Sequence, residues 1–195
     1  MSRFDLAMSY KQEMEDIKQL SNHEIFTVML SDKEIKALEL AVKKNPINSL
    51  ERIESFLSYN FICGKKCEEI QDSLLIRYWI STLAAAYADE VYSKKEVLKK
   101  IDEITKKFNM PDLFVYLECD YNERIQRIEY RNLLEGNSGD DISEYRDYRY
   151  REIISVIEQK LTNFVRIQVT NINIDKLVEI IMAHLESLRI EANDK

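Results

Sequence analysis

The sequence predicts a helix-rich α/β fold in which helices flank a parallel sheet of four or five strands. Short apolar segments of strand-like composition alternate with longer segments whose apolar residues recur at helical spacing, and this alternation is typical of parallel strands joined by helices. Only three glycines and two prolines occur among 195 residues, which favours helices with short connections.

The expected elements follow one another without a linker or a repeat, which predicts a single domain over residues 1–195. The initial segment is ambiguous: residues 3–20 carry apolar side chains at helical spacing, but an alternating pattern from Phe4 to Tyr10 also fits a short strand. The predicted strands are residues 25–31, 73–76, 113–119 and 164–169. The predicted helices are residues 32–44, 49–62, the alanine-containing segment after residue 76, 93–108, 122–134, 142–161 and 173–188.

Local signals support several of these elements. Residues 113–119 are almost uniformly apolar, which predicts a strand buried on both faces. Ser31 or Asp32 can cap the helix that follows them. Ser93 with Glu96 three residues later predicts a helix that starts with a capping box.

Composition limits the classes of partner. The formal net charge of -7 argues against nucleic acid, which normally requires a basic face. No apolar run is long enough for a membrane span, and the charged beginning of the chain does not resemble a secretory signal. The three cysteines have no disulfide-framework spacing, which favours a reducing cytoplasm.

Three segments resemble the thymidylate kinase family. PDLFVYLECDYNERIQRIEYR, at 111–131, resembles the family's Pro-Asp-Leu segment with its apolar strand, acidic end and helix of spaced arginines. IRYWISTLA, at 76–84, resembles the family's Asp-Arg-Tyr-x-x-Ser-x-x-Ala element, and the chain from residue 164 onward resembles the last strand and helix of that fold. The resemblance covers roughly residues 50–190 and implies a P-loop-kinase-like, three-layer architecture.

The resemblance implies an acceptor site at Arg77. Its guanidinium would bind the phosphate of the acceptor nucleotide, because a planar fork at the end of a strand suits phosphate oxygens. Tyr78 and Ser81 would lie beside the nucleotide, and core packing is the alternative for Tyr78. A structural ion pair is the alternative for Arg77.

The resemblance also implies a lid near residues 132–145, with Arg127 and Arg131 leading into it. These two arginines, with Arg124 and the arginines of the next predicted helix, would supply positive charge to a transferring phosphoryl group. A solvated helix face explains them equally well. Asp120, at the end of its predicted strand, is a possible catalytic acid.

Two essential parts of such a kinase are absent from the sequence. No G-x-x-x-x-G-K-[ST] loop occurs, and Gly64–Lys65 lacks the first glycine and the hydroxyl residue of that loop. The acidic residue expected before Arg77 is Ile76. CGKKC, at 63–67, also fails as a tetrahedral metal site because two cysteines cannot complete the shell, so no metal ligand is predicted.

The sequence therefore predicts a cytoplasmic, nucleotide-kinase-like protein that binds a nucleotide or regulates a partner without transferring phosphate. One alternative is an active deoxynucleotide kinase, using ATP and Mg²⁺, whose P-loop lies outside this chain. Another is an interaction protein with no nucleotide site. A homodimer formed through helices is implied by the resemblance.

Overall fold

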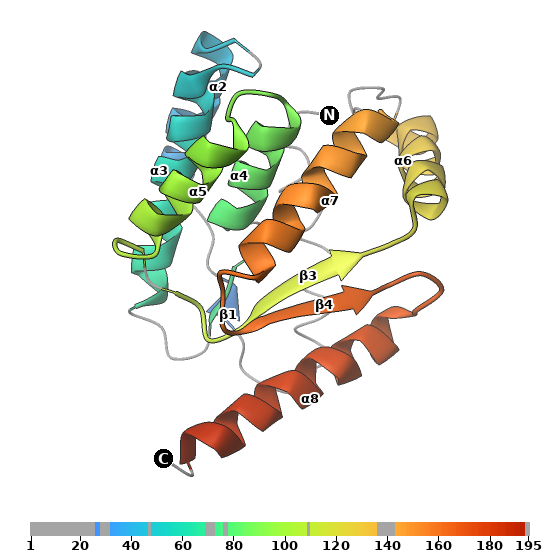
Figure 1. Ribbon diagram of the computed structural model, residues 1–195. Coiled ribbons are helices and arrows are strands. Elements are labelled where there is room, and N and C mark those ends of the chain that lie inside the picture. The colour runs from blue at the N-terminus through green and yellow to red at the C-terminus, as the bar shows by residue number, and fades with distance from the viewer. Residues whose placement is uncertain are drawn as a thin grey trace. The chain divides into compact units, whose positions relative to one another are not determined.

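The computed structural model describes residues 26–27, 32–46, 48–68, 73–75, 78–108, 110–135 and 143–193, which form seven helices and four short strands (Figure 1). These elements group into two compact units. We call the described residues within 25–110 and 141–160 the helical unit, and those within 111–140 and 161–195 the strand unit. The prediction of one domain over residues 1–195 stays a prediction.

The helical unit contains five helices and one pair of two-residue strands. Its helices are α2 (Asp32–Lys44), α3 (Leu50–Cys67), α4 (Trp79–Ala88), α5 (Lys94–Ile104) and α7 (Glu144–Glu158), and its strands are β1 (Phe26–Thr27) and β2 (Ser73–Leu74). β1 and β2 pair in parallel. The predicted helix at 32–44 is confirmed, and α3 continues five residues past its predicted end at residue 62.

Serine side chains cap the N-termini of three of these helices. Ser49 accepts a hydrogen bond from the backbone N–H of Arg52, and Ser143 caps α7 in the same way. The capping box predicted at Ser93 is confirmed: its hydroxyl accepts from the Glu96 N–H at 3.3 Å, and its own N–H donates to the Glu96 carboxylate at 2.7 Å.

The core of the helical unit surrounds α4, which packs against α3, α5 and α7 (Figure 1). Nine of its ten residues are buried, because the helix is apolar on every side and its alanines allow neighbouring helices to approach closely. Trp79 and Leu83 are fully buried. Trp79, Tyr78 and Tyr87 are core residues, with exposed fractions of 0%, 7% and 6%. Core packing was the alternative for Tyr78, and its place beside a nucleotide stays a prediction.

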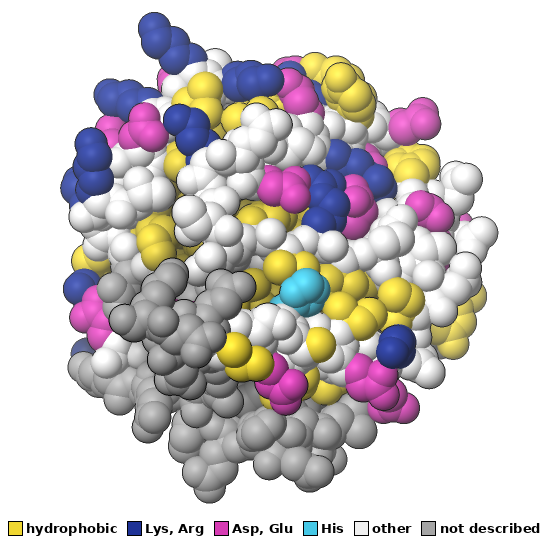
Figure 2. All heavy atoms as spheres, turned by 60° about the horizontal axis from the view of Figure 1, so that its bottom comes forward, with side chains coloured by type: hydrophobic (Ala, Val, Ile, Leu, Met, Phe, Trp, Pro, Cys, Tyr) yellow, Lys and Arg dark blue, Asp and Glu magenta, His cyan; other side chains and the backbone are white. Residues whose placement is uncertain are grey.

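The strand unit contains one parallel pair of strands and two helices. They are β3 (Phe114–Glu118), β4 (Phe164–Gln168), α6 (Tyr121–Glu135) and α8 (Ile174–Asn193). β3 and β4 lie side by side, with Phe114 opposite Phe164 and Glu118 opposite Gln168 (Figure 1). Figure 2 brings α8 forward and shows hydrophobic side chains on its surface. Leu177, Ile181, Leu185 and Leu188 of this helix are only partly buried.

The predicted sheet of four or five strands within a three-layer architecture is wrong. In the described residues, the strands form two separate parallel pairs, β1–β2 and β3–β4. The prediction relied on apolar composition, which overestimated the burial of the strands. Of the predicted strands at 25–31 and 73–76, the described residues show β1 and β2, and β3 is not buried on both faces because Leu117 is 47% exposed. The helix-rich character and the parallel pairing are as predicted.

No helix in the described part of the chain is both long enough and apolar enough to cross a membrane.

Candidate functional site

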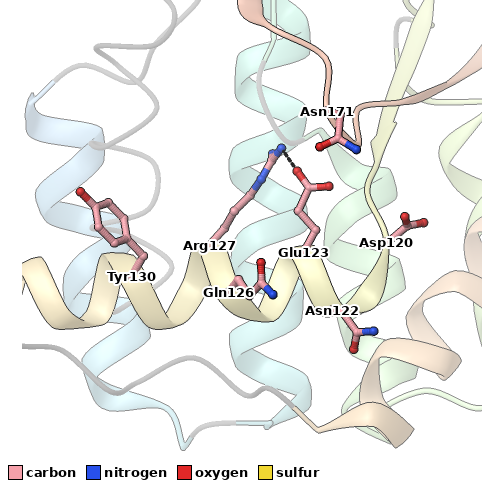
Figure 3. A pocket seen from close by; sticks show the side chains of 7 residues that line it. All are labelled: Asp120, Asn122, Glu123, Gln126, Arg127, Tyr130 and Asn171. Atoms are coloured by element: carbon pink, nitrogen blue, oxygen red, sulfur yellow. Dashed lines mark hydrogen bonds and ion pairs between the residues drawn. The ribbon is translucent and has the colours of Figure 1, made fainter.

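A hollow of about 590 Å³ lies in the strand unit, where β3 ends and α6 begins (Figure 3). This position follows a general rule, because ligands of parallel α/β proteins bind beyond the carboxyl ends of the strands. Its side chains come from the end of β3, the first three turns of α6 and the turn after β4. They are Asp120, Asn122, Glu123, Gln126, Arg127, Tyr130 and Asn171.

The ends of the two strands position Asp120. At the ends of β3 and β4, the Val169 N–H donates a hydrogen bond of 2.7 Å to the Glu118 carbonyl. Beyond it, the Asp120 N–H donates to the Thr170 hydroxyl at 3.1 Å, and Gln168 Nε2 donates to Asp120 Oδ1 at 3.0 Å. These two bonds fix the carboxylate at the edge of the hollow.

Helix α6 contributes an ion pair to the hollow. Glu123 and Arg127 are one turn apart, and their side chains point toward one another (Figure 3). Arg127 Nη2 also donates a weak hydrogen bond of 3.4 Å to the Val169 carbonyl. The Arg127 side chain is 53% exposed, so a ligand can reach the guanidinium.

The turn after β4 adds an amide. Asn171 has a left-handed backbone conformation with φ of 59°, which asparagine adopts more readily than most residues. In the next turn, the Asn173 side chain accepts from the Lys176 N–H at 2.9 Å and caps α8. The β4–α8 turn is therefore held by its own hydrogen bonds and presents Asn171 to the hollow (Figure 3).

The lining suits a polar ligand. Two carboxylates and one guanidinium give it a formal charge of -1, and three amides supply both donors and acceptors. Tyr130 adds an aromatic ring that is 65% exposed. No group of three or more His, Cys, Asp or Glu side chains that could hold a metal ion occurs in the residues described. The hollow can thus bind a small molecule through hydrogen bonds and one positive charge.

The structure brings two of the sequence-predicted site residues together here. Asp120 and Arg127 line the same hollow. Arg131 belongs to α6, but its side chain lies outside the described residues. Half of the lid predicted at 132–145 also lies outside them, because residues 136–142 are not described.

Two residues of the predicted acceptor site, Tyr78 and Ser81, belong to the helical unit. Arg77 and Ile76 lie outside the described residues. Ser81 is in the first turn of α4, and its hydroxyl donates to the Tyr78 carbonyl at 3.0 Å. The Tyr78 ring packs against Trp79 and Phe108. Burial raises the pKa of the Tyr78 phenol well above its ordinary value, so its hydroxyl remains protonated.

Two arginines of α7, which the resemblance offered as phosphate ligands, bind the end of α4 instead. Arg146 Nε donates to Asp89 Oδ1 at 2.6 Å. Arg149 Nη2 donates to the Tyr87 carbonyl at 2.7 Å, and its guanidinium lies 4.1 Å from the centre of the Tyr87 ring. Both side chains therefore join helices within the helical unit.

Sequence reasoning missed five residues of the hollow, which are Asn122, Glu123, Gln126, Tyr130 and Asn171. A signal for some of them exists in the sequence. Asn122 and Gln126 repeat at i and i+4 at the start of a helix that follows a strand, and Asn171 lies in a polar cluster directly after the last strand.

No model of a known protein family matches the chain, and no curated protein matches it either. The resemblance to thymidylate kinases stays a prediction.

Proposed function

We propose that the protein binds a nucleotide in the hollow of the strand unit, as a nucleotide-kinase-like protein that does not transfer phosphate. One observation carries this proposal: Asp120 and Arg127, both selected from the sequence, line one hollow at the ends of two adjacent parallel strands. The exposed Arg127 guanidinium is the cation for the nucleotide phosphate, and the amides and Tyr130 contact the sugar and base. Binding requires the phosphate to displace Glu123 from Arg127.

The proposal includes no phosphoryl transfer because the sequence lacks the phosphate-binding loop that such transfer requires. No G-x-x-x-x-G-K-[ST] motif occurs in the sequence. The Gly64–Lys65 pair lies inside α3, where backbone N–H groups are committed to the helix and cannot cradle a phosphate. We also propose the cytoplasm as the compartment, since Cys63, Cys67 and Cys119 form no disulfide.

Calorimetric titration with thymidine monophosphate, thymidine triphosphate and thymidine, each with and without Mg²⁺, tests the proposal. The monophosphate should bind without needing Mg²⁺, and Arg127→Leu should weaken it by about tenfold to a hundredfold, the equivalent of one charge-assisted hydrogen bond. Glu123→Gln should bind the monophosphate more tightly, because the competing carboxylate is gone.

Arg151→Leu is the matched control. Arg151 forms an i, i+4 ion pair with Asp147 at 2.8 Å, as Arg127 does with Glu123, but on α7 in the helical unit. This variant should bind the monophosphate as the parent does. Equal binding by Arg127→Leu and the parent would reject the hollow as the site.

A second candidate function is a protein-interaction module. Tyr130 and Leu133 lie three residues apart on α6 and are 65% and 81% exposed. If none of the nucleotides binds, this candidate replaces nucleotide binding.

A further inference from the structure

Cys63 and Cys67 lie one helical turn apart in the last two turns of α3. The sequence pattern predicted a helix ending at residue 62, with CGKKC beyond it. Because α3 extends through Cys67, the spacing i, i+4 places both side chains on the same helix face, with their Cβ atoms about 5–6 Å apart. Both residues are partly exposed and form no disulfide.

Tyr78 packs against α3 beside the two cysteines. Its hydroxyl approaches the helix so closely that a Cβ atom on Gly64, which directly follows Cys63, would overlap it.

In the part of the chain that the structure describes, the two sulfurs form a pair of donors and not a larger group. Glu68, the nearest carboxylate in sequence, forms an ion pair with Lys65 at 2.7 Å. In the described residues, no third His, Cys, Asp or Glu completes a metal-binding group with them. Two thiolates alone do not complete a tetrahedral zinc site, whereas a soft monovalent ion that binds two thiolates in a linear arrangement needs no further ligand.

We propose that Cys63 and Cys67 bind one Cu(I) ion as a bis-thiolate. Two S–H bonds break, two S–Cu bonds form and two protons are released, with no change of oxidation state; the ion arrives already reduced. Lys66 lies three residues after Cys63 and directly before Cys67 on the same helix, so its positive charge is close in sequence to the resulting anionic complex. This site is in the helical unit and is independent of the nucleotide proposal.

Anaerobic competition between the full chain and a chromogenic Cu(I) chelator tests the proposal. The parent should take up one Cu(I). Cys63→Ser and Cys67→Ser should each lower the affinity by about a hundredfold or more, because a single thiolate loses the chelate advantage. Cys119→Ser is the matched control, since Cys119 is also a partly exposed thiol, and it should bind as the parent does.

A second measurement uses the parent chain alone, so it does not depend on how the variants fold. Cu(I) should protect Cys63 and Cys67 from alkylation, as mapped by mass spectrometry, and leave Cys119 reactive. Equal protection of all three cysteines, protection of none, or unchanged affinity in either single variant would overturn the proposal.

Discussion

The helical unit and the strand unit differ in how completely they bury their side chains. Among the residues described, the largest fully buried side chains all belong to the helical unit. They are Trp79, Ile53, Leu83, Ile101, Ile153, Ile154, Ile157 and Val97. In the strand unit the buried side chains of Ile167, Val178, Phe114 and Val169 retain 5–9% exposure, and α6 has no buried residue among those whose burial is described.

The two units also use polar side chains differently. In the helical unit, arginines and tyrosines join one helix to another, as Arg146 does with Asp89 and Tyr87 with Glu152. In the strand unit, Arg166 pairs with Glu118 on the neighbouring strand, whereas Arg127 pairs with Glu123 of its own helix, donates weakly to the Val169 carbonyl and stays half exposed. Arginine-rich sequence alone therefore does not identify a binding site, because Arg146 joins two helices while Arg127 remains accessible.

The largest expected effect is on stability, and it tests directly whether the two units differ in how much their buried side chains stabilise them. Ile154→Ala removes a fully buried side chain from α7 and should lower the free energy of unfolding by about 2–5 kcal/mol. Leu117→Ala in β3, where the side chain is 47% exposed, should cost less than about 1 kcal/mol. Urea denaturation measures both. If the two variants lost equal free energy of unfolding, the buried side chains of the helical unit would contribute no more to stability than those of the strand unit.

A smaller effect is expected at the contact between α3 and α4. Gly64→Ala should destabilise the protein by about 1–3 kcal/mol, because the added methyl group overlaps the Tyr78 hydroxyl. In a Tyr78→Phe background that oxygen is absent, and the same substitution should be much less harmful, since alanine is the better helix former by about 1 kcal/mol. A double-mutant cycle measures the coupling, and purely additive effects would contradict the close contact.

The smallest expected effect concerns pH. Lys94 and Tyr87 donate hydrogen bonds to Glu152 at 3.0 and 2.8 Å and lower the pKa of its carboxyl below the ordinary value. A lowered pKa contributes stability that is full above the unfolded pKa and is lost as pH falls through the folded pKa. Glu152→Gln should therefore be less stable than the parent at about pH 7 and nearly equal to it at about pH 3.

Denaturant titrations at both pH values check this expectation, with Glu158→Gln at the end of the same helix as control. A difference between Glu152→Gln and the parent that persists undiminished in acid would mean that the charge of Glu152 does not stabilise the helical unit.

Helices were easier to predict than the sheet because their signals are local. The capping box at Ser93 and the 32–44 helix depend on residues a few positions apart, and both are confirmed. Strand partners depend on distant segments, so the apolar runs did not reveal that the described strands form two separate pairs. The end of α3 was missed because GKK interrupts the apolar periodicity while the helix continues to Cys67.

The candidate site was predicted in part. Asp120 and Arg127 were found because they follow a strand and repeat on a helix, but the sequence did not reveal that Glu123 pairs with Arg127. Asn171 was missed because its part in the hollow depends on β4 pairing beside β3, about 50 residues earlier in the chain. For Tyr78 the sequence offered core packing only as an alternative to a nucleotide contact, and its close approach to Gly64 required the packing of α3 against α4.

Hydrogen–deuterium exchange of the full chain, with and without saturating thymidine monophosphate, tests the central claim most directly. The account predicts slow exchange in α4 and α7 that the nucleotide leaves unchanged, and new protection in the first turns of α6 and at the end of β3. Protection confined to α4 and α7, or no change anywhere at saturating nucleotide, would contradict a nucleotide site in the strand unit.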